Sequence, residues 1–163
     1  MRREVIGACL IWVVALGGAT AQRCQTWSTE LRLWSDAAAK TPKKPRPWIN
    51  LGLAREQAGD LPGAFQAYSA ALALSYQPRI SHYQQRFSNV AARTNIARAL
   101  AMSEHVPEAE MMLTQIVTEF PRFAHAHYNL GVLYAKTGRC EQATAHIDAA
   151  RTLEPDFPPM GAC

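Results

Sequence analysis

The chain has 163 residues, of which 48% are hydrophobic and 18% charged, and its formal net charge is +4 at pH 7. This length suits one folded domain, and the hydrophobic fraction excludes a wholly disordered chain. The basic residues are dispersed, apart from a group at positions 40–46 that two prolines interrupt. A nucleic-acid-binding protein would carry a basic face with aromatic platforms, so we expect no nucleic-acid partner.

The four cysteines form no Cys-x-x-Cys pair, so a zinc site of paired cysteines and a thioredoxin-like centre have no support. Cys9 lies in an apolar N-terminal run, which leaves Cys24, Cys140 and Cys163. A disulfide between Cys140 and Cys163 would need an oxidising compartment and a tail that folds back. Unpaired thiols are the default expectation.

The N-terminal segment, residues 1–22, contains an uncharged run from Val5 to Ala21 that follows two arginines. Two interpretations remain open. The Ala19-Thr-Ala21 sequence is typical of a signal peptide cleaved before Gln22, whereas the length of the run is at the short end for a membrane-spanning anchor. The leading arginines favour a cytoplasmic N-terminus. Both interpretations therefore place the rest of the chain outside the cytoplasm, either membrane-anchored or secreted.

Residues 23–44 are expected to hold one helix, from Ser28 to Lys40, and a linker. Ser28 or Thr29 would cap this helix, because a hydroxyl oxygen accepts from the N–H groups of the first turn. Pro42 marks its end, since proline cannot continue a helix. Aligned on that proline, the segment matches the second half of the repeats that follow it.

Three segments then share one pattern, at residues 45–78, 90–123 and 124–157. Each has a large residue, a small residue near a leucine, a turn, an alanine and a second large residue at matching offsets. The residues that carry the pattern are Trp48, Leu51, Gly52, Gly59, Ala64, Tyr68 and Ala71; then Ile96, Ala97, Leu100, Ala109, Leu113, Ile116 and Pro121; then His127, Leu130, Gly131, Tyr134, Gly138, Ala143, Ile147, Ala150 and Pro155. Val90 and Ala124 are 34 residues apart, the length of one two-helix unit.

The pattern has a physical reason. Two helices cross closely where side chains are small, which Gly52, Ala97 and Gly131 provide. Glycine at positions 59 and 138 tolerates the positive φ of a tight turn. These motifs resemble the tetratricopeptide repeat family. The resemblance implies an all-α fold: an α-solenoid of about three helical hairpins, with residues 23–44 as a preceding half-repeat.

Residues 79–89 break the phase of the repeats and are interpreted as an insertion. Its later part, Ser81 to Asn89, is expected to extend the next helix at its N-terminal end. After the third unit, the proline-rich end of the chain, including the tail 158–163, is expected to be irregular. The last apolar face would be covered by Phe157 and Met160, or by another chain.

In the resembled family, the first helix of each hairpin lines a concave groove. Asn50, Asn95 and Asn129 occupy the same inward position of the three units. An amide both donates and accepts hydrogen bonds, so it can pair with the backbone of an extended peptide whatever its sequence. The same groove would contain Tyr128, with Arg98 and Lys136 placed to meet a carboxylate. The alternative is that this face is simply solvated.

Catalytic motifs are absent from the sequence: it has no phosphate-binding glycine loop, no Gly-x-Ser-x-Gly elbow and no His-Glu-x-x-His helix. His125 and His127 are two residues apart and would point to different sides of a helix, which disfavours a metal site. We therefore expect no enzyme activity, no cofactor and no metal. The leading hypothesis is a scaffold that binds a partner protein or peptide.

A wider resemblance covers Arg23 to Gly52 and the apolar run before it. The residues that carry it are Arg23, Trp27, Glu30, Leu33, Trp34, Asp36, Lys40, Pro42, Arg46, Asn50, Leu51 and Gly52. They resemble the junction between the last transmembrane helix and the repeats in the transmembrane and tetratricopeptide O-mannosyltransferase family. This favours an uncleaved anchor and gives a second hypothesis, an accessory part of a membrane glycosyltransferase system. The many-helix catalytic portion is absent from this sequence.

Overall fold

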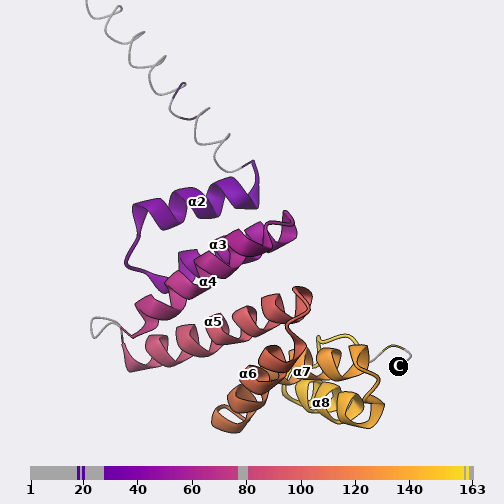
Figure 1. Cartoon of the computed structure of the whole chain (residues 1–163). Coiled ribbons are helices and arrows are strands. Elements are labelled where there is room, and N and C mark those ends of the chain that lie inside the picture. The colour runs from indigo at the N-terminus through magenta and orange to yellow at the C-terminus, as the bar shows by residue number, and fades with distance from the viewer. Residues whose placement is uncertain (1–17, 19, 21–27, 77–80, 160, 162–163) are drawn as a thin grey trace, which may run out of the picture.

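A computed structural model of the chain describes residues 18, 20, 28–76, 81–159 and 161. These residues form α-helices and no strand, which confirms the predicted all-α class (Figure 1). The helices are α2 (Glu30–Lys40), α3 (Pro45–Gln57), α4 (Leu61–Ser75), α5 (His82–Met102), α6 (Val106–Glu119), α7 (Ala124–Lys136) and α8 (Cys140–Leu153). They stack in chain order as the hairpins α3–α4, α5–α6 and α7–α8, preceded by α2 (Figure 1).

The predicted anchor or signal peptide, residues 1–22, lies outside the described residues except for positions 18 and 20. Within the part of the chain that the structure describes, no helix combines the length and apolar character needed to cross a bilayer.

Side-chain caps begin three of the helices. Thr29, one of the two residues expected to cap α2, accepts from the Arg32 N–H at 3.3 Å. Asp60 accepts from the Gly63 N–H at 2.9 Å at the start of α4. Ser81 caps α5, so residues 82–89 of the insertion are helical, and the predicted N-terminal extension of this helix is confirmed.

The hairpins close where the small residues were predicted. A Cβ atom on Gly131 would lie 2.6 Å from Ile147 Cγ1 on α8, and a Cβ on Gly52 would overlap the ring of Tyr68 on α4. In the second hairpin, fully buried Ala97 shares a cluster with Ala109 and Leu113. These contacts form a continuous core along the stack rather than one central cluster.

The chain after Leu153 leaves the helix and turns back over α7. The ring of Phe157 stacks with 4.7 Å between centroids on Tyr128 of α7, a residue that was expected to line the groove. Met160, the other expected cover residue, lies outside the described residues. The default expectation of unpaired thiols is wrong for Cys140, which is disulfide-bonded. The other cysteines are not among the residues described.

Candidate functional site

A cavity of about 290 Å³ lies between α5 and α7, the first helices of the second and third hairpins. Its lining comes from three helices: Arg98, Ala101 and Met102 of α5, Leu113 of α6, and Tyr128, Asn129, Val132, Leu133 and Lys136 of α7. Four residues predicted for the groove, Arg98, Tyr128, Asn129 and Lys136, meet here. We refer to this cavity as the α5–α7 groove.

The three asparagines are not brought together in the cavity. Asn129 lines it, whereas Asn50 on α3 and Asn95 on α5 lie outside its lining. Asn95 accepts from Arg98 Nη2 at 3.4 Å, so part of its amide is engaged within α5. All three are partly exposed. The sequence pattern assigns the three asparagines equivalent positions of the repeat, but they lie on three different helices, α3, α5 and α7, along the stack.

The two basic residues of the groove, Arg98 and Lys136, differ in their ion pairing. Arg98 Nη1 lies 2.9 Å from Glu56 Oε1, and the Glu56 side chain is 9% exposed. Glu56 also accepts from the Tyr68 hydroxyl at 3.0 Å. Burial, together with the Glu56 carboxylate, raises the pKa of Tyr68 well above its usual range, so the phenol stays a donor. Lys136 makes no ion pair within the described part of the chain.

A row of aromatic rings continues from the groove toward the N-terminal end of α5. Tyr128 stacks on Phe157, which meets the His125 ring edge to face at 5.0 Å. His125 in turn stacks on Phe123 at 5.6 Å, and Phe123 meets Phe87 of α5 at 6.4 Å. Sequence reasoning missed this row. One signal in the sequence could have indicated it: Phe123 and Phe157 each lie two residues after the proline that ends a hairpin.

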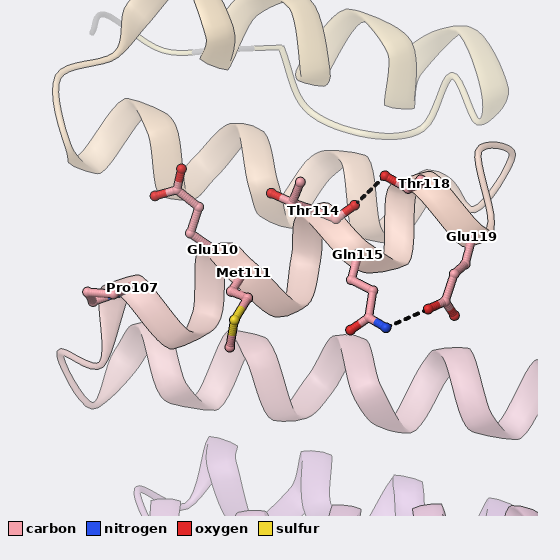
Figure 2. Close-up of a pocket in the computed structure, with 7 residues that line it drawn as sticks. All are labelled: Pro107, Glu110, Met111, Thr114, Gln115, Thr118 and Glu119. Atoms are coloured by element: carbon pink, nitrogen blue, oxygen red, sulfur yellow. Dashed lines mark hydrogen bonds between the residues drawn. The ribbon is translucent and has the colours of Figure 1, made fainter.

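A second, more open hollow of about 720 Å³ lies on α6, and Figure 2 shows its lining side chains. All of them come from this one helix, and its carboxylates are already paired. Arg139 binds Glu110 through two contacts of 2.7 Å, and Arg93 lies 2.6 Å from Glu119. These arginines lower the pKa of both carboxyl groups. The carboxylates of this hollow are therefore already engaged and are poorly placed to bind a ligand.

Two histidines bridge the helices of the third hairpin. The Nδ1 atoms of His127 and His146 are 3.1 Å apart, and His127 Nε2 donates to the Pro121 carbonyl at 3.1 Å. Because His127 carries its proton on Nε2, its Nδ1 accepts from His146 Nδ1. Burial, and secondarily His127, lower the pKa of His146. No group of three or more potential metal ligands occurs among the described residues.

Comparison with solved structures shows the same fold. A double mutant of MamA from RS-1 aligns with a TM-score of 0.55 and 23% identity, covering 88% of this chain and 76% of that one. MamA 41-end from Desulfovibrio magneticus RS-1 gives 0.54 and 23% over the same shares. Another crystal structure of MamA gives 0.53 and 17%, covering 78% of this chain and 68% of that one. No curated protein matches the sequence significantly.

The family comparison covers both parts of the helical stack. The sequence model described as "Tetratricopeptide repeat" matches residues 31–77, from α2 to α4, and residues 83–156, from α5 to α8. Together the two matches span most of the chain. Stacked helical hairpins of this kind form concave surfaces that bind other proteins. The chain belongs to the tetratricopeptide repeat family.

Proposed function

We propose that this chain is an interaction module that binds an extended segment of a partner protein in the α5–α7 groove. The observation that carries the proposal is the convergence of four inward-facing side chains, Arg98, Tyr128, Asn129 and Lys136, on one cavity. They come from two different hairpins, so the site exists only in the stacked array. The family and the fold support the general role of a protein-binding module.

The lining suits a peptide rather than a compact metabolite. Asn129 offers one donor and one acceptor side by side, which matches the alternating groups of a peptide backbone. Met102 and Val132 supply apolar surface between the polar groups. Lys136 supplies a positive charge that no described carboxylate pairs with, so it favours a ligand with an acidic group.

A photocrosslinking amino acid at Val132 tests the groove, with Thr114 in the α6 hollow as the matched control. Val132 is half-buried in the lining of the groove, whereas Thr114 is exposed and lines only the α6 hollow. We expect a defined adduct from Val132 in cells, loss of this adduct when Asn50, Asn95 and Asn129 are all replaced by alanine, and no adduct from Thr114. Equal labelling from both positions would contradict a groove-specific partner.

We further propose that the repeats work outside the cytoplasm. The uncharged N-terminal run after two arginines supports export, and the disulfide-bonded Cys140 suits an oxidising compartment. N-terminal sequencing of membrane and soluble fractions tests the idea. A start at Gln22 in an extracytoplasmic soluble fraction, or an intact Met1 in the membrane fraction, would support it. An intact Met1 in the cytosol would refute it.

A further inference from the structure

The ring of Phe157 lies beside the groove, against Tyr128, which lines it. It stacks on Tyr128 with 4.7 Å between centroids and 25° between planes, and meets His125 at 5.0 Å and 84°. Both of these residues belong to α7, and Tyr128 also lines the cavity. A segment of the chain's own C-terminal end is therefore seated on the surface that a partner peptide would use.

The described residues of this segment, 154–159, are held by weak contacts. Residues 154–159 form no helix, and the Phe157 N–H reaches the Glu154 carbonyl in a long bond of 3.4 Å. The Glu154 carboxylate lies 3.8 Å from His125 Nδ1, and both side chains are more than half exposed. Such an exposed contact contributes little. Among the contacts of residues 154–159, the stacking of the Phe157 ring is therefore the main one, and the short connection to α8 gives this ring a high local concentration.

The chemistry of the surface selects a similar ligand from outside. The lining of the cavity contains two basic residues, Arg98 and Lys136, and no acidic one. The tail seated beside it has the opposite character, with Glu154 and Asp156 just before Phe157. Aromatic rings in offset stacks gain about 0.5–1.5 kcal/mol beyond their buried area. A peptide that joins acidic groups to an aromatic ring complements both ends of the groove.

The row of rings also includes surface beyond the contacts of Phe157. Phe87 meets Phe123 but is 55% exposed, and Tyr83, one turn earlier on α5, is 79% exposed. Both belong to the helical extension that the insertion adds. Exposed apolar rings next to a groove are typical of interaction surfaces.

We propose that Phe157 is a built-in competitor for the groove, and that the partner is an extended acidic segment whose aromatic ring displaces it from Tyr128 and His125. This inference rests on the proposed function, because it names the kind of peptide that the α5–α7 groove accepts. Binding then requires exchange of one ring for another, which lowers the apparent affinity of every ligand by the same factor. A ligand with a second ring gains further contacts with Phe87 and Tyr83.

The test uses a fluorescein-labelled synthetic peptide with the sequence of residues 153–159 and the full-length chain in detergent. Fluorescence polarisation measures its affinity for the wild type, for Phe157→Ala and for the control Phe65→Ala, which removes a 42% exposed ring on α4. We expect Phe157→Ala to bind the probe about three- to tenfold more tightly than the wild type, from the stacking free energy regained. Phe65→Ala should match the wild type, and a probe with alanine in place of its phenylalanine should bind much more weakly.

A second measurement keeps the native tail. A single 4-fluorophenylalanine at position 157 should change its ¹⁹F chemical shift when the unlabelled probe is added, because the ring leaves Tyr128. Equal probe affinity for the wild type and Phe157→Ala, with no ¹⁹F change, would overturn the competition and leave Phe157 as a cover of the last hairpin.

The remaining outcomes separate this inference from the proposed function. If no variant binds the probe but the Val132 crosslink still captures a partner, the groove binds a peptide of other chemistry and the inference falls alone. If the probe fails and the crosslink also fails, both proposals fall. Loss of probe binding to Phe157→Ala on adding Tyr128→Ala, with an unchanged circular dichroism spectrum, would place the exchange at this ring.

Discussion

Glu104 has a left-handed backbone conformation, with a φ of 64°, in the turn between α5 and α6. The corresponding turns of the other hairpins have Gly59 at 80° and Gly138 at 75°. A side chain disfavours this conformation by about 1–2 kcal/mol, whereas glycine adopts it readily. We predict that Glu104→Gly raises the free energy of unfolding by about 0.5–1 kcal/mol in urea titrations. Glu108→Gly, inside the first turn of α6, should lower it instead, and a loss in both variants would contradict the explanation.

The His127–His146 pair should make the stability of the third hairpin depend on pH. The folded state lowers the pKa of His146 below its unfolded value of about 6.5, so it favours the neutral ring. The unfolded chain then binds more protons, and stability is complete above that value and falls as the pH decreases through the folded pKa. A second proton would also place two N–H groups against each other across 3.1 Å.

Urea titrations at pH 7.5 and pH 5.5 test this dependence. We predict a lower free energy of unfolding at pH 5.5 for the wild type and a smaller difference for His146→Gln. His105→Gln, which changes an exposed histidine at the start of α6, should behave as the wild type. The Glu110 and Glu119 ion pairs do not contribute to a difference in stability between these two pH values. Their lowered pKa values move the loss of those contacts to pH below about 4.5.

At the scale of helices, the third hairpin depends on the absence of a side chain at Gly131. A Cβ there would lie 2.6 Å from Ile147 Cγ1 and 3.1 Å from the Ala143 carbonyl oxygen, and the backbone atom cannot rotate away. We predict that Gly131→Ala lowers the free energy of unfolding by about 1–3 kcal/mol, despite the better helix propensity of alanine. The double variant with Ile147→Ala should lose less unfolding free energy than the sum of the two single variants, because the shorter side chain at position 147 leaves space for the new methyl group at position 131. If the two losses of unfolding free energy were strictly additive, the close contact between α7 and α8 would not be the cause of the effect of Gly131→Ala.

The sequence predicts the helices well and their mutual contacts poorly, for a physical reason. Caps, turns and close crossings depend on residues within one hairpin, so the patterns around Thr29, Gly59 and Gly131 carry the information locally. Contacts between hairpins depend on how far one rotates over the next, which no local spacing encodes. The pairing of Arg98 with Glu56 is therefore not predicted, although both residues lie in expected helices. The contact of Phe157 with Tyr128 is not predicted either, because it joins the irregular end of the chain to α7.

At the scale of the whole molecule, Glu56 joins the first two hairpins. It accepts from Tyr68 within the first hairpin and pairs with Arg98 of α5 in the second. In a linear array, stability is approximately a sum of the hairpins and of the interfaces between neighbours, so a nearly buried carboxylate at one interface affects cooperativity along the stack. The same carboxylate neutralises one of the two cations of the α5–α7 groove, which couples the stability of the array to the charge of its site.

This coupling predicts that Glu56→Gln changes stability and binding in opposite directions. The free energy of unfolding should fall by about 1–3 kcal/mol, since Arg98 and Tyr68 lose a charged acceptor. The affinity for the acidic peptide of residues 153–159 should rise, because the guanidinium of Arg98 becomes available to it. Asp36→Asn is the matched control: its pair with Lys40 is exposed, so both quantities should stay nearly constant. A fall in affinity with Glu56→Gln would mean that the carboxylate positions Arg98 for the ligand rather than competing with it.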